Sequence, residues 1–392
     1  MAHTTEILFG LFIVFLAAQV GAEVAQRLKM PSVVGQIVAG ALIGPSVLGW
    51  IQINEPLEVL AEIGAVLLLF SIGLETRVDD LKRVGRLATL VGVIGVIVPF
   101  VMGAAWARSS GFPSSKAVFI AAAFVATSVG ITARVLQELN VLSRLESRII
   151  LGAAVIDDIL AMLLLGFVSA LQVGNGVNVL GLILVAAQAI GFVILIAVFG
   201  TRLMRRASNV VDKPVDPLSP LTISLVLCLG LAVAASHIGL AAIIGAFLAG
   251  MVAGEIRQRK TLEHQLQPIA AFLVPFFFVV TGAKVQVSQF GNMATLLTLL
   301  LIVALAVVSK LIGCGLGAWS LGRRKALIVG VGMMPRGEVG IIVASLGKQA
   351  GVFDDTIYAL LIAMSLITSI IAPPILKILF KREKTDPQTA AA

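Results

Sequence analysis

The sequence predicts an all-α membrane protein with about 13 transmembrane helices, arranged as two inverted six-helix repeats. Three observations lead to this prediction: an apolar composition, an alternating distribution of basic residues, and matching motifs 210 residues apart. Of the 392 residues, 59% are hydrophobic and 13% are charged, whereas a soluble domain is about half apolar and roughly a quarter charged. This composition excludes a soluble enzyme, a nucleic-acid-binding module and a disordered chain.

Apolar runs of about 20 residues mark helices long enough to cross a bilayer. The first run begins at Ile7 without a basic start and continues into a full span, so it does not read as a signal peptide. Residues 1–382 are expected to form a single transmembrane domain, and residues 383–392 a short cytoplasmic tail. The thirteen predicted spans are 6–27, 31–50, 57–76, 84–107, 114–135, 147–173, 177–201, 218–237, 240–256, 265–283, 292–320, 325–348 and 355–380.

Basic residues predict the orientation of these spans, because Lys and Arg gather in cytoplasmic loops. With the N-terminus outside, 23 of the 29 Lys and Arg residues fall in cytoplasmic loops and four fall on the other side. The C-terminus is then cytoplasmic, and the protein is expected in the cell (inner or plasma) membrane. Lys310 and Arg336 are the two basic residues that this count leaves over, and both lie deep inside predicted spans.

Two motifs recur at the same offset along the chain. Residues 34–44 and 244–254 share three glycines and one alanine, and Val129-Gly130-Ile131 is matched by Val339-Gly340-Ile341. Each motif and its copy are seven spans apart, and an odd displacement places the copies upside down relative to each other in the membrane. Inverted repeats of this kind are typical of secondary transporters.

The offset divides the chain into a first repeat, 6–173, a linking helix, 177–201, and a second repeat, 218–380. The matched fifth and twelfth spans also contain helix-breaking sequences. Ala126–Thr132 combines hydroxyl side chains with a glycine, and Met334–Gly340 contains a proline, two glycines and two charges. Unwound backbone at membrane depth survives only where protein or a water-filled cavity satisfies it, so two crossed discontinuous helices are expected.

Charged residues inside a membrane are costly and mark functional sites. Asp157 and Asp158 lie about ten residues inside a long apolar span, near the bilayer centre. Neighbouring helical residues point about 100° apart, so one aspartate can pair with a cation on another helix while the other faces a cavity. Lys310 is the natural counter-charge. Arg336 and Glu338 are expected to play a structural and electrostatic role at the second break.

Buried carboxylates bind protons more tightly than exposed ones and can exchange them near physiological pH. Carboxylate, hydroxyl and carbonyl oxygens also suit a small hard cation such as Na⁺. A proton and a cation that compete for one site, exposed alternately to the two sides of the membrane, produce antiport. The expected ion- and proton-binding residues are Asp157, Asp158, Lys310, Thr127 and Ser128, with the two aspartates as Na⁺ ligands.

At Thr127-Ser128, Asp157-Asp158, Lys310 and Pro335-Arg336-Gly337-Glu338, the sequence resembles bacterial sodium/proton antiporters of the cation:proton antiporter-2 family, NapA type. The stretch 126–158 carries the most specific part of the resemblance, which extends over nearly the whole chain. The resemblance implies an NhaA-like fold, a homodimer, and an elevator motion of a core that includes 84–173 and 292–380.

The resemblance also implies individual roles. Asp158 is the expected ion-binding carboxylate, Asp157 pairs with Lys310, and Thr127 lines the site. Exchange is then electrogenic, taking cytoplasmic Na⁺ or Li⁺ out for external H⁺. K⁺ remains an alternative substrate, because cavity size and coordination number are not visible in a sequence. A sodium-coupled organic-anion symporter is a weaker alternative, because such a protein needs more polar residues along its cavity.

An enzymatic function is not expected. An intramembrane aspartyl protease needs two facing carboxylates, which neighbouring positions on one helix do not provide. Cys228 and Cys314 lie in apolar runs and are expected to pack in the interior. The three histidines have no metal-ligand spacing, and no cofactor is expected beyond the transported Na⁺ and H⁺. The remaining partner is the lipid bilayer; nucleic acid is not expected.

Overall fold

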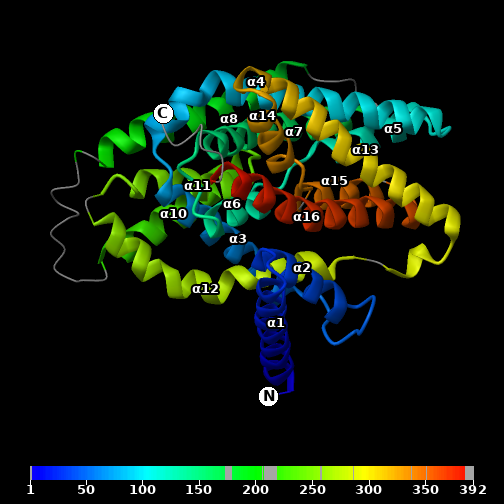
Figure 1. Cartoon of the computed structure of the whole chain (residues 1–392), viewed down its shortest axis with the longest axis horizontal. Coiled ribbons are helices and arrows are strands. Elements are labelled where there is room, and N and C mark those ends of the chain that lie inside the picture. Colours follow the sequence, from blue (N-terminus) through cyan, green and yellow to red (C-terminus); the bar gives the residue numbers. More distant parts are fainter. Residues whose placement is uncertain are drawn as a thin grey trace.

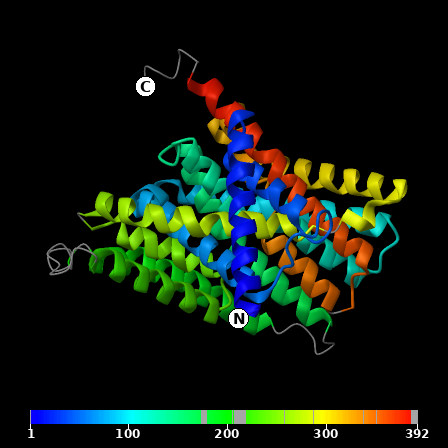
Figure 2. The same ribbon diagram turned by 90° about the horizontal axis from the view of Figure 1, so that it is seen from below.

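The computed structural model describes residues 2–172, 179–204, 206, 219–256, 258–285, 287–336, 338–349 and 351–384. It is built of helices, which Figure 1 and, from below, Figure 2 show. The α-helices of the first half are α1 (Ala2–Arg27), α2 (Ser32–Ile43), α3 (Glu55–Glu75), α4 (Val78–Ser109), α5 (Ser114–Val125), α6 (Val129–Glu138), α7 (Leu145–Gln172) and α8 (Val179–Ile194), followed by a π-helical turn at Leu195–Gly200. The second half contains α10 (Ser219–His237), α11 (Ala242–Ala253), α12 (Arg259–Ala283), α13 (Met293–Gly317), α14 (Arg323–Gly332), α15 (Glu338–Gln349) and α16 (Asp355–Lys384).

Each of the thirteen predicted segments overlaps at least one α-helix; 114–135 and 325–348 each overlap a pair of short helices, and 177–201 overlaps α8 and the π-helical turn after it. Within the described ranges, nine helical segments are long and apolar enough to cross a membrane, and α2 and α11 are shorter apolar helices. The chain is therefore a membrane protein with many spans. The number of crossings stays a prediction.

Local sequence explains where two of the central helices begin. The Asn54 side chain accepts a hydrogen bond from the Leu57 backbone N–H at 3.2 Å, and a proline follows in the first turn of α3. Asn292 caps α13 in the same way, accepting from the Ala294 N–H at 3.1 Å. Side-chain caps of this kind satisfy backbone donors that the first helical turn leaves without partners.

The helices form two groups that pack mainly within themselves. The first group contains α1, α2, α3, α10, α11 and α12, and the second contains α4–α7 and α13–α16. In Figure 1, α10, α11 and α12 lie at the left and bottom, and α5, α13, α15 and α16 lie at the right. Contacts between the groups involve mainly α2 and α3 on one side and α6 and α16 on the other.

Glycines bring four helices of the first group into backbone contact. A Cβ at Gly40 of α2 would overlap the Val279 carbonyl oxygen of α12, and a Cβ at Gly250 of α11 would overlap the Phe70 carbonyl oxygen of α3. The reverse contacts repeat the arrangement: Gly282 meets Ile37, and Gly73 meets Phe247. Small residues allow this close packing in a membrane, where main-chain approach and dispersion drive helix association.

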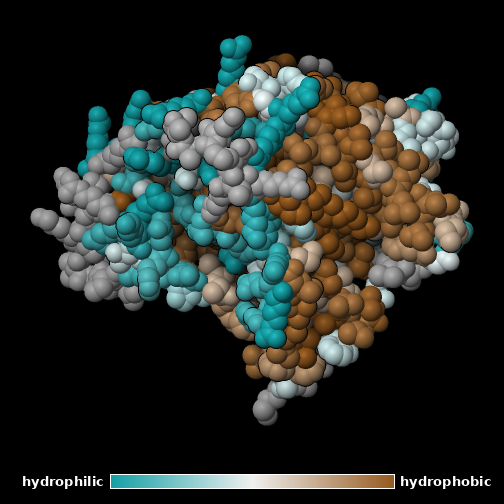
Figure 3. Space-filling model, viewed as in Figure 1, coloured by the Kyte–Doolittle hydropathy of each residue, from teal (hydrophilic) through white to brown (hydrophobic). Residues whose placement is uncertain are grey.

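Large hydrophobic side chains cover much of the outer surface. Figure 3 shows them over the region of α13 at the right and over α1 at the bottom, while hydrophilic residues gather at the centre and left. Leu8, Phe9 and Phe12 of α1 are each about 60% exposed, as are several leucines of α13. Such a surface fits the hydrocarbon of a bilayer and would be unstable in water.

Candidate ion-binding site

The two predicted helix breaks cross each other inside the second group. The chain leaves helical geometry at 126–128, between α5 and α6, and again from Met333, between α14 and α15. The Ser128 N–H donates to the Pro335 carbonyl at 2.8 Å, and the Thr132 hydroxyl donates to the Gly332 carbonyl at 2.7 Å. Each unwound segment thus satisfies backbone groups of the other, as buried non-helical backbone requires.

Thr127 and Ser128 are both buried at this crossing. The Thr127 hydroxyl lies 3.4 Å from the Met333 carbonyl oxygen, to which it donates a long hydrogen bond. Both residues thus lie where the sequence predicts an ion-binding break, and the Thr127 hydroxyl lies beside a carbonyl oxygen of the opposite segment. The part of each residue in ion binding remains a prediction.

Arg336 lies inside the crossing and is fully buried. Its guanidinium donates to the carbonyl oxygens of Val125 at 2.9 Å, Ala126 at 3.2 Å and Ala306 at 3.3 Å. The first two carbonyls belong to the C-terminal end of α5, where the helix dipole is negative and the last carbonyls have no partner within the helix. Arg336 therefore compensates the broken end of α5. The Glu338 side chain and Gly337 lie outside the described residues.

A buried ion pair joins α7 to α13 beside the crossing. Lys310 Nζ donates to Asp157 Oδ1 at 2.7 Å, and both side chains are inaccessible to solvent. The second carboxylate oxygen of Asp157 has no hydrogen-bond partner among the described residues. Arg336 also interacts electrostatically with Asp157. Two cations thus stabilise the negative charge of one aspartate in a dry environment, where an isolated charge is very costly.

Asp158 points away from this pair, toward the boundary with the first group. It is 8% exposed and lines a cavity of about 10 Å³ with Leu69, Val129, Leu151 and Ile243, among others. A cavity of this size holds about one water molecule. Asp157 and Asp158 are neighbours on one helix and point in different directions. Asp157 therefore contacts the Lys310 ammonium, and Asp158 faces a small cavity.

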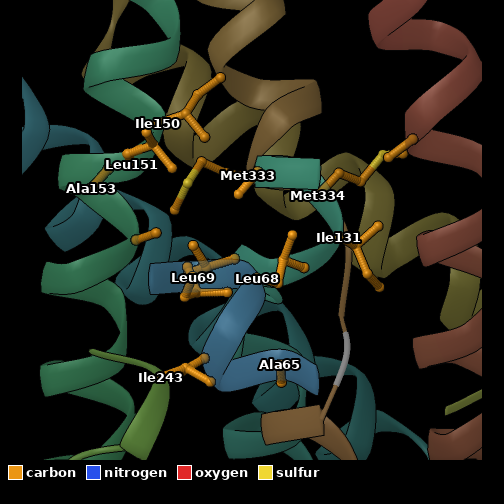
Figure 4. Close-up of a cluster of buried hydrophobic side chains, with 14 of the residues drawn as sticks. Ala65, Leu68, Leu69, Ile131, Ile150, Leu151, Ala153, Ile243, Met333 and Met334 are labelled. Carbon is orange, nitrogen blue, oxygen red and sulfur yellow. The ribbon is translucent and has the colours of Figure 1, made fainter. Parts of the chain in front are cut away.

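An apolar cluster surrounds this cavity. Figure 4 shows Leu68 and Leu69 of α3, Ile243 of α11 and Leu151 of α7 converging with Met333 of the second break. Leu68 also lines a much larger polar cavity, of about 810 Å³, that lies among α1, α2, α3, α6 and α12. Leu68 and Leu69 thus line the large and the small cavity respectively, and Asp158 does not line the large one.

Glycines on α4 and α13 allow the ion pair to form. A Cβ at Gly95 would lie 2.5 Å from Cys314 Sγ and 3.8 Å from Lys310 Nζ, and a Cβ at Gly313 would lie 2.8 Å from the Ile94 carbonyl oxygen. A Cβ at Gly92 would lie 2.9 Å from Ile156 Cβ of α7. α4 thus packs closely against both α7 and α13. This close packing keeps α7 and α13 near enough for Lys310 to bind Asp157.

We expect Gly313→Ala to lower the free energy of unfolding by about 1–3 kcal/mol, because the new methyl group meets backbone that no rotamer change can move. Gly315→Ala is the matched control on the same helix, where the nearest atom would lie at 3.8 Å. That control should be neutral or stabilising by up to about 1 kcal/mol, since alanine favours helix over glycine. Unfolding titrations in detergent micelles measure both; equal effects would contradict the close contact.

The sequence analysis did not identify two residues that contact Arg336. The Arg336 N–H donates to the Thr368 hydroxyl at 3.2 Å, and the Ser369 hydroxyl donates to the Arg336 carbonyl at 2.8 Å. Both hydroxyls are buried on α16. The sequence places Thr132 in the first predicted break but does not indicate its bond to Gly332. A pair of buried hydroxyls in an apolar span was the available signal for α16.

Comparison with known proteins agrees with this architecture. Residues 11–382 match the family described as sodium/hydrogen exchanger, transmembrane. The chain is 34% identical to the high-affinity Na⁺/H⁺ antiporter NhaS3 of Synechocystis over 97% of this chain and 91% of that protein. It is 34% identical to the Na⁺/H⁺-K⁺ antiporter GerN of Bacillus cereus over 96% of each chain, and 32% identical to a Na⁺/H⁺ antiporter of Enterococcus hirae over 95% and 97%.

The fold is also similar to a solved structure. The sodium/proton antiporter MjNhaP1 of Methanocaldococcus jannaschii, determined at pH 8, superposes with a TM-score of 0.69 over 97% of this chain and 99% of that one. The sequence identity is 16%, so the likeness establishes the fold. The family match covers nearly the whole chain, and the buried charges lie at the crossed breaks. The chain belongs to the transmembrane sodium/hydrogen exchanger family.

Proposed function

We propose that this protein is an electrogenic antiporter that exchanges cytoplasmic Na⁺ or Li⁺ for external H⁺. The observation that carries the proposal is the placement of two neighbouring aspartates beside the crossed breaks: Asp157 is bound to Lys310 at 2.7 Å, and Asp158 lines a small cavity. Asp158 binds the cation when ionised and releases it when protonated. Competition between a proton and a cation for the same oxygens couples their movements in opposite directions.

The two helix groups provide a means of alternating access. The second group contains both breaks and the ion pair, and it contacts the first group through few helices. Movement of the second group as an elevator would carry Asp158 from one side of the apolar cluster to the other. The core boundaries 84–173 and 292–380, the homodimer and the NapA-type subgroup are parts of this proposal.

The packing of the first group supports inverted repeats. At an offset of 210 residues, Gly40 of α2 corresponds to Gly250 of α11, and both meet a carbonyl oxygen of a long helix from the other repeat. The pairs Gly282–Ile37 and Gly73–Phe247 show the same reciprocity. A two-fold axis in the membrane plane produces this pattern, in which each repeat makes with the other the same contact that it receives. With the predicted orientation, the N-terminus is outside and the C-terminus cytoplasmic.

Reconstituted protein in proteoliposomes tests the function. Pulses of Na⁺, Li⁺ or K⁺ are applied outside while internal pH is recorded at a clamped and then a varied membrane potential. Proton movement driven by Na⁺ and sensitive to voltage is the expected result. Movement driven by K⁺ alone would favour the second candidate, a K⁺/H⁺ antiporter, which the name of the 34% identical GerN makes worth testing.

We expect Asp157→Asn to impair exchange or make it electroneutral, because the variant removes the carboxylate that holds Lys310. The measurement is the dependence of Na⁺-driven proton flux on membrane potential, compared with that of the unchanged protein. If the flux of this variant kept the full voltage dependence, the proposal that both aspartates contribute to the charge moved across the membrane would be wrong.

A further inference from the structure

Two junctions of hydrogen bonds connect the helix groups at the end of α6. Glu138, the last residue of α6, accepts from the backbone N–H of Ser32 at 3.0 Å and from the Ser32 hydroxyl. Gln137 donates to the Glu75 carboxylate, at the end of α3, at 2.9 Å. α6 belongs to the second group, whereas α2 and α3 belong to the first. These bonds therefore cross the boundary along which an elevator must slide.

The first junction replaces a missing helix cap. α2 begins at Ser32 after Pro31, and its N-cap residue supplies no side-chain hydrogen bond. The Glu138 carboxylate takes that role from another helix, where the positive end of the α2 dipole favours a negative charge. Arg134 orients the carboxylate through a 3.1 Å bond to Oε1. Hydrogen bonds to an ionised acceptor are among the stronger ones in proteins.

The junction is directly connected to the ion site. α6 runs from the first break, with Ser128 before its first residue, to Glu138 at its end. It is about 15 Å long at 1.5 Å per residue, short enough to act as one rigid rod. A bond that holds Glu138 therefore also holds the break and the Thr132–Gly332 contact relative to α2.

The inverted copy lacks this chemistry. At the 210-residue offset, Ser32 and Glu138 correspond to Ala242, the first residue of α11, and Lys348. Lys348 binds Asp355 at 2.8 Å and lies 4.7 Å from the Tyr358 ring, both within the second group. A lysine would repel the positive end of α11, and alanine offers it no hydroxyl. The equivalent junction cannot form on the opposite side of the membrane.

We propose that Glu138 is a positioning residue of the transport cycle: its bonds to Ser32 hold the two helix groups in the arrangement described, and no equivalent bond holds the opposite arrangement. The proposal rests on the proposed exchange by an elevator motion. Breaking the junction then shifts the balance of the two arrangements in one direction only. Ser32, Glu75 and Glu138 line the large polar cavity. The change in spacing between the two helix groups is therefore expected on the side of the molecule that holds this cavity.

Spin labels on the two groups measure the balance directly. Leu28 is exposed after the end of α1, and Ser143 is exposed in the loop before α7, so cysteines at these positions report the spacing between the groups. Cys228 and Cys314 are buried and stay unlabelled. Double electron–electron resonance is recorded on the full chain in lipid nanodiscs, with and without Glu138→Ala.

We expect Glu138→Ala to lower the population with the described spacing, relative to the population with the alternative spacing, about tenfold. This change corresponds to a loss of about 1.4 kcal/mol. Ser32→Ala should shift it in the same direction by less, because the backbone N–H remains. Glu263→Ala is the matched control, since Glu263 lines the same cavity but pairs with Arg259 on its own helix. It should leave the distances unchanged.

Identical distance distributions for Glu138→Ala and the unchanged protein would overturn the proposal, as would an equal shift in Glu263→Ala. The measurement needs no transport and is repeated with Asp158→Asn, so its result is independent of the ion that is carried. Absence of Na⁺-driven proton flux in the unchanged protein would instead refute the proposed function while the distances stayed readable.

Discussion

Asp158→Asn is expected to reduce Na⁺-driven proton flux to the level of liposomes without protein. Asparagine has nearly the same shape, so the small cavity and its apolar lining stay in place. What disappears is the carboxylate that, in the proposed mechanism, binds a proton in one state and a cation in the other. Without a titrating ligand, no free energy couples the two ions. Internal pH recorded after a Na⁺ pulse in proteoliposomes gives the flux.

A matched control separates this effect from a general loss of charge. Asp354 lies in the loop before α16, where it pairs with Lys116 at 3.1 Å and is largely exposed. Asp354→Asn should retain the flux of the unchanged protein. Exchange that persists in Asp158→Asn would refute the assignment of the ion site, and the stabilisation of each variant by added Na⁺ in thermal unfolding gives an independent measure of binding.

Lys310→Met is expected to lower the free energy of unfolding by about 3–5 kcal/mol, the cost of leaving one member of a buried ion pair without its partner. Methionine fills much of the volume of the lysine stem, so the effect is electrostatic. Asp157 then loses its 2.7 Å contact, and its other oxygen already lacks a hydrogen-bond partner among the described residues. Unfolding in detergent micelles, followed by circular dichroism, measures the change.

The double variant Asp157→Asn/Lys310→Met distinguishes this cause from lost packing. With both charges removed, most of the destabilisation should disappear, because a buried ion pair and a neutral pair often differ little in stability. A strong positive coupling between the two positions is therefore expected in the double-mutant cycle. If the double variant were as unstable as the sum of the single ones, the charge of Asp157 would not be the cause.

The helices, their breaks and the buried charges were visible in the sequence because each is a local signal. An apolar run, a Pro-Arg-Gly sequence or an aspartate in a hydrophobic stretch can be recognised without knowledge of the fold. The sequence prediction of broken fifth and twelfth spans agrees with the ends of α5 at Val125 and α14 at Gly332.

Partner choice was less accessible, because it depends on how the helices cross. The residues alone left open which aspartate pairs with Lys310, and the family resemblance implied Asp157. The sequence predicted an electrostatic role for Arg336 but no single partner, and the described contacts are with backbone carbonyls at the end of α5 and on α13. The Ser32–Glu138 contact spans 106 residues of sequence, and neither residue alone indicates the other.

The glycine contacts of the first group also bear on the response of the protein to its lipid surroundings. Where α2 meets α12 and α11 meets α3, main chain touches main chain, and rotamer changes cannot absorb strain there. These four helices are packed so tightly that sliding or tilting of one helix must move the others. Strain from a thinner or thicker bilayer is therefore transferred to the boundary with the second group, where fewer helices are in contact. Membrane thickness thereby acts on the same boundary at which Asp158 lies.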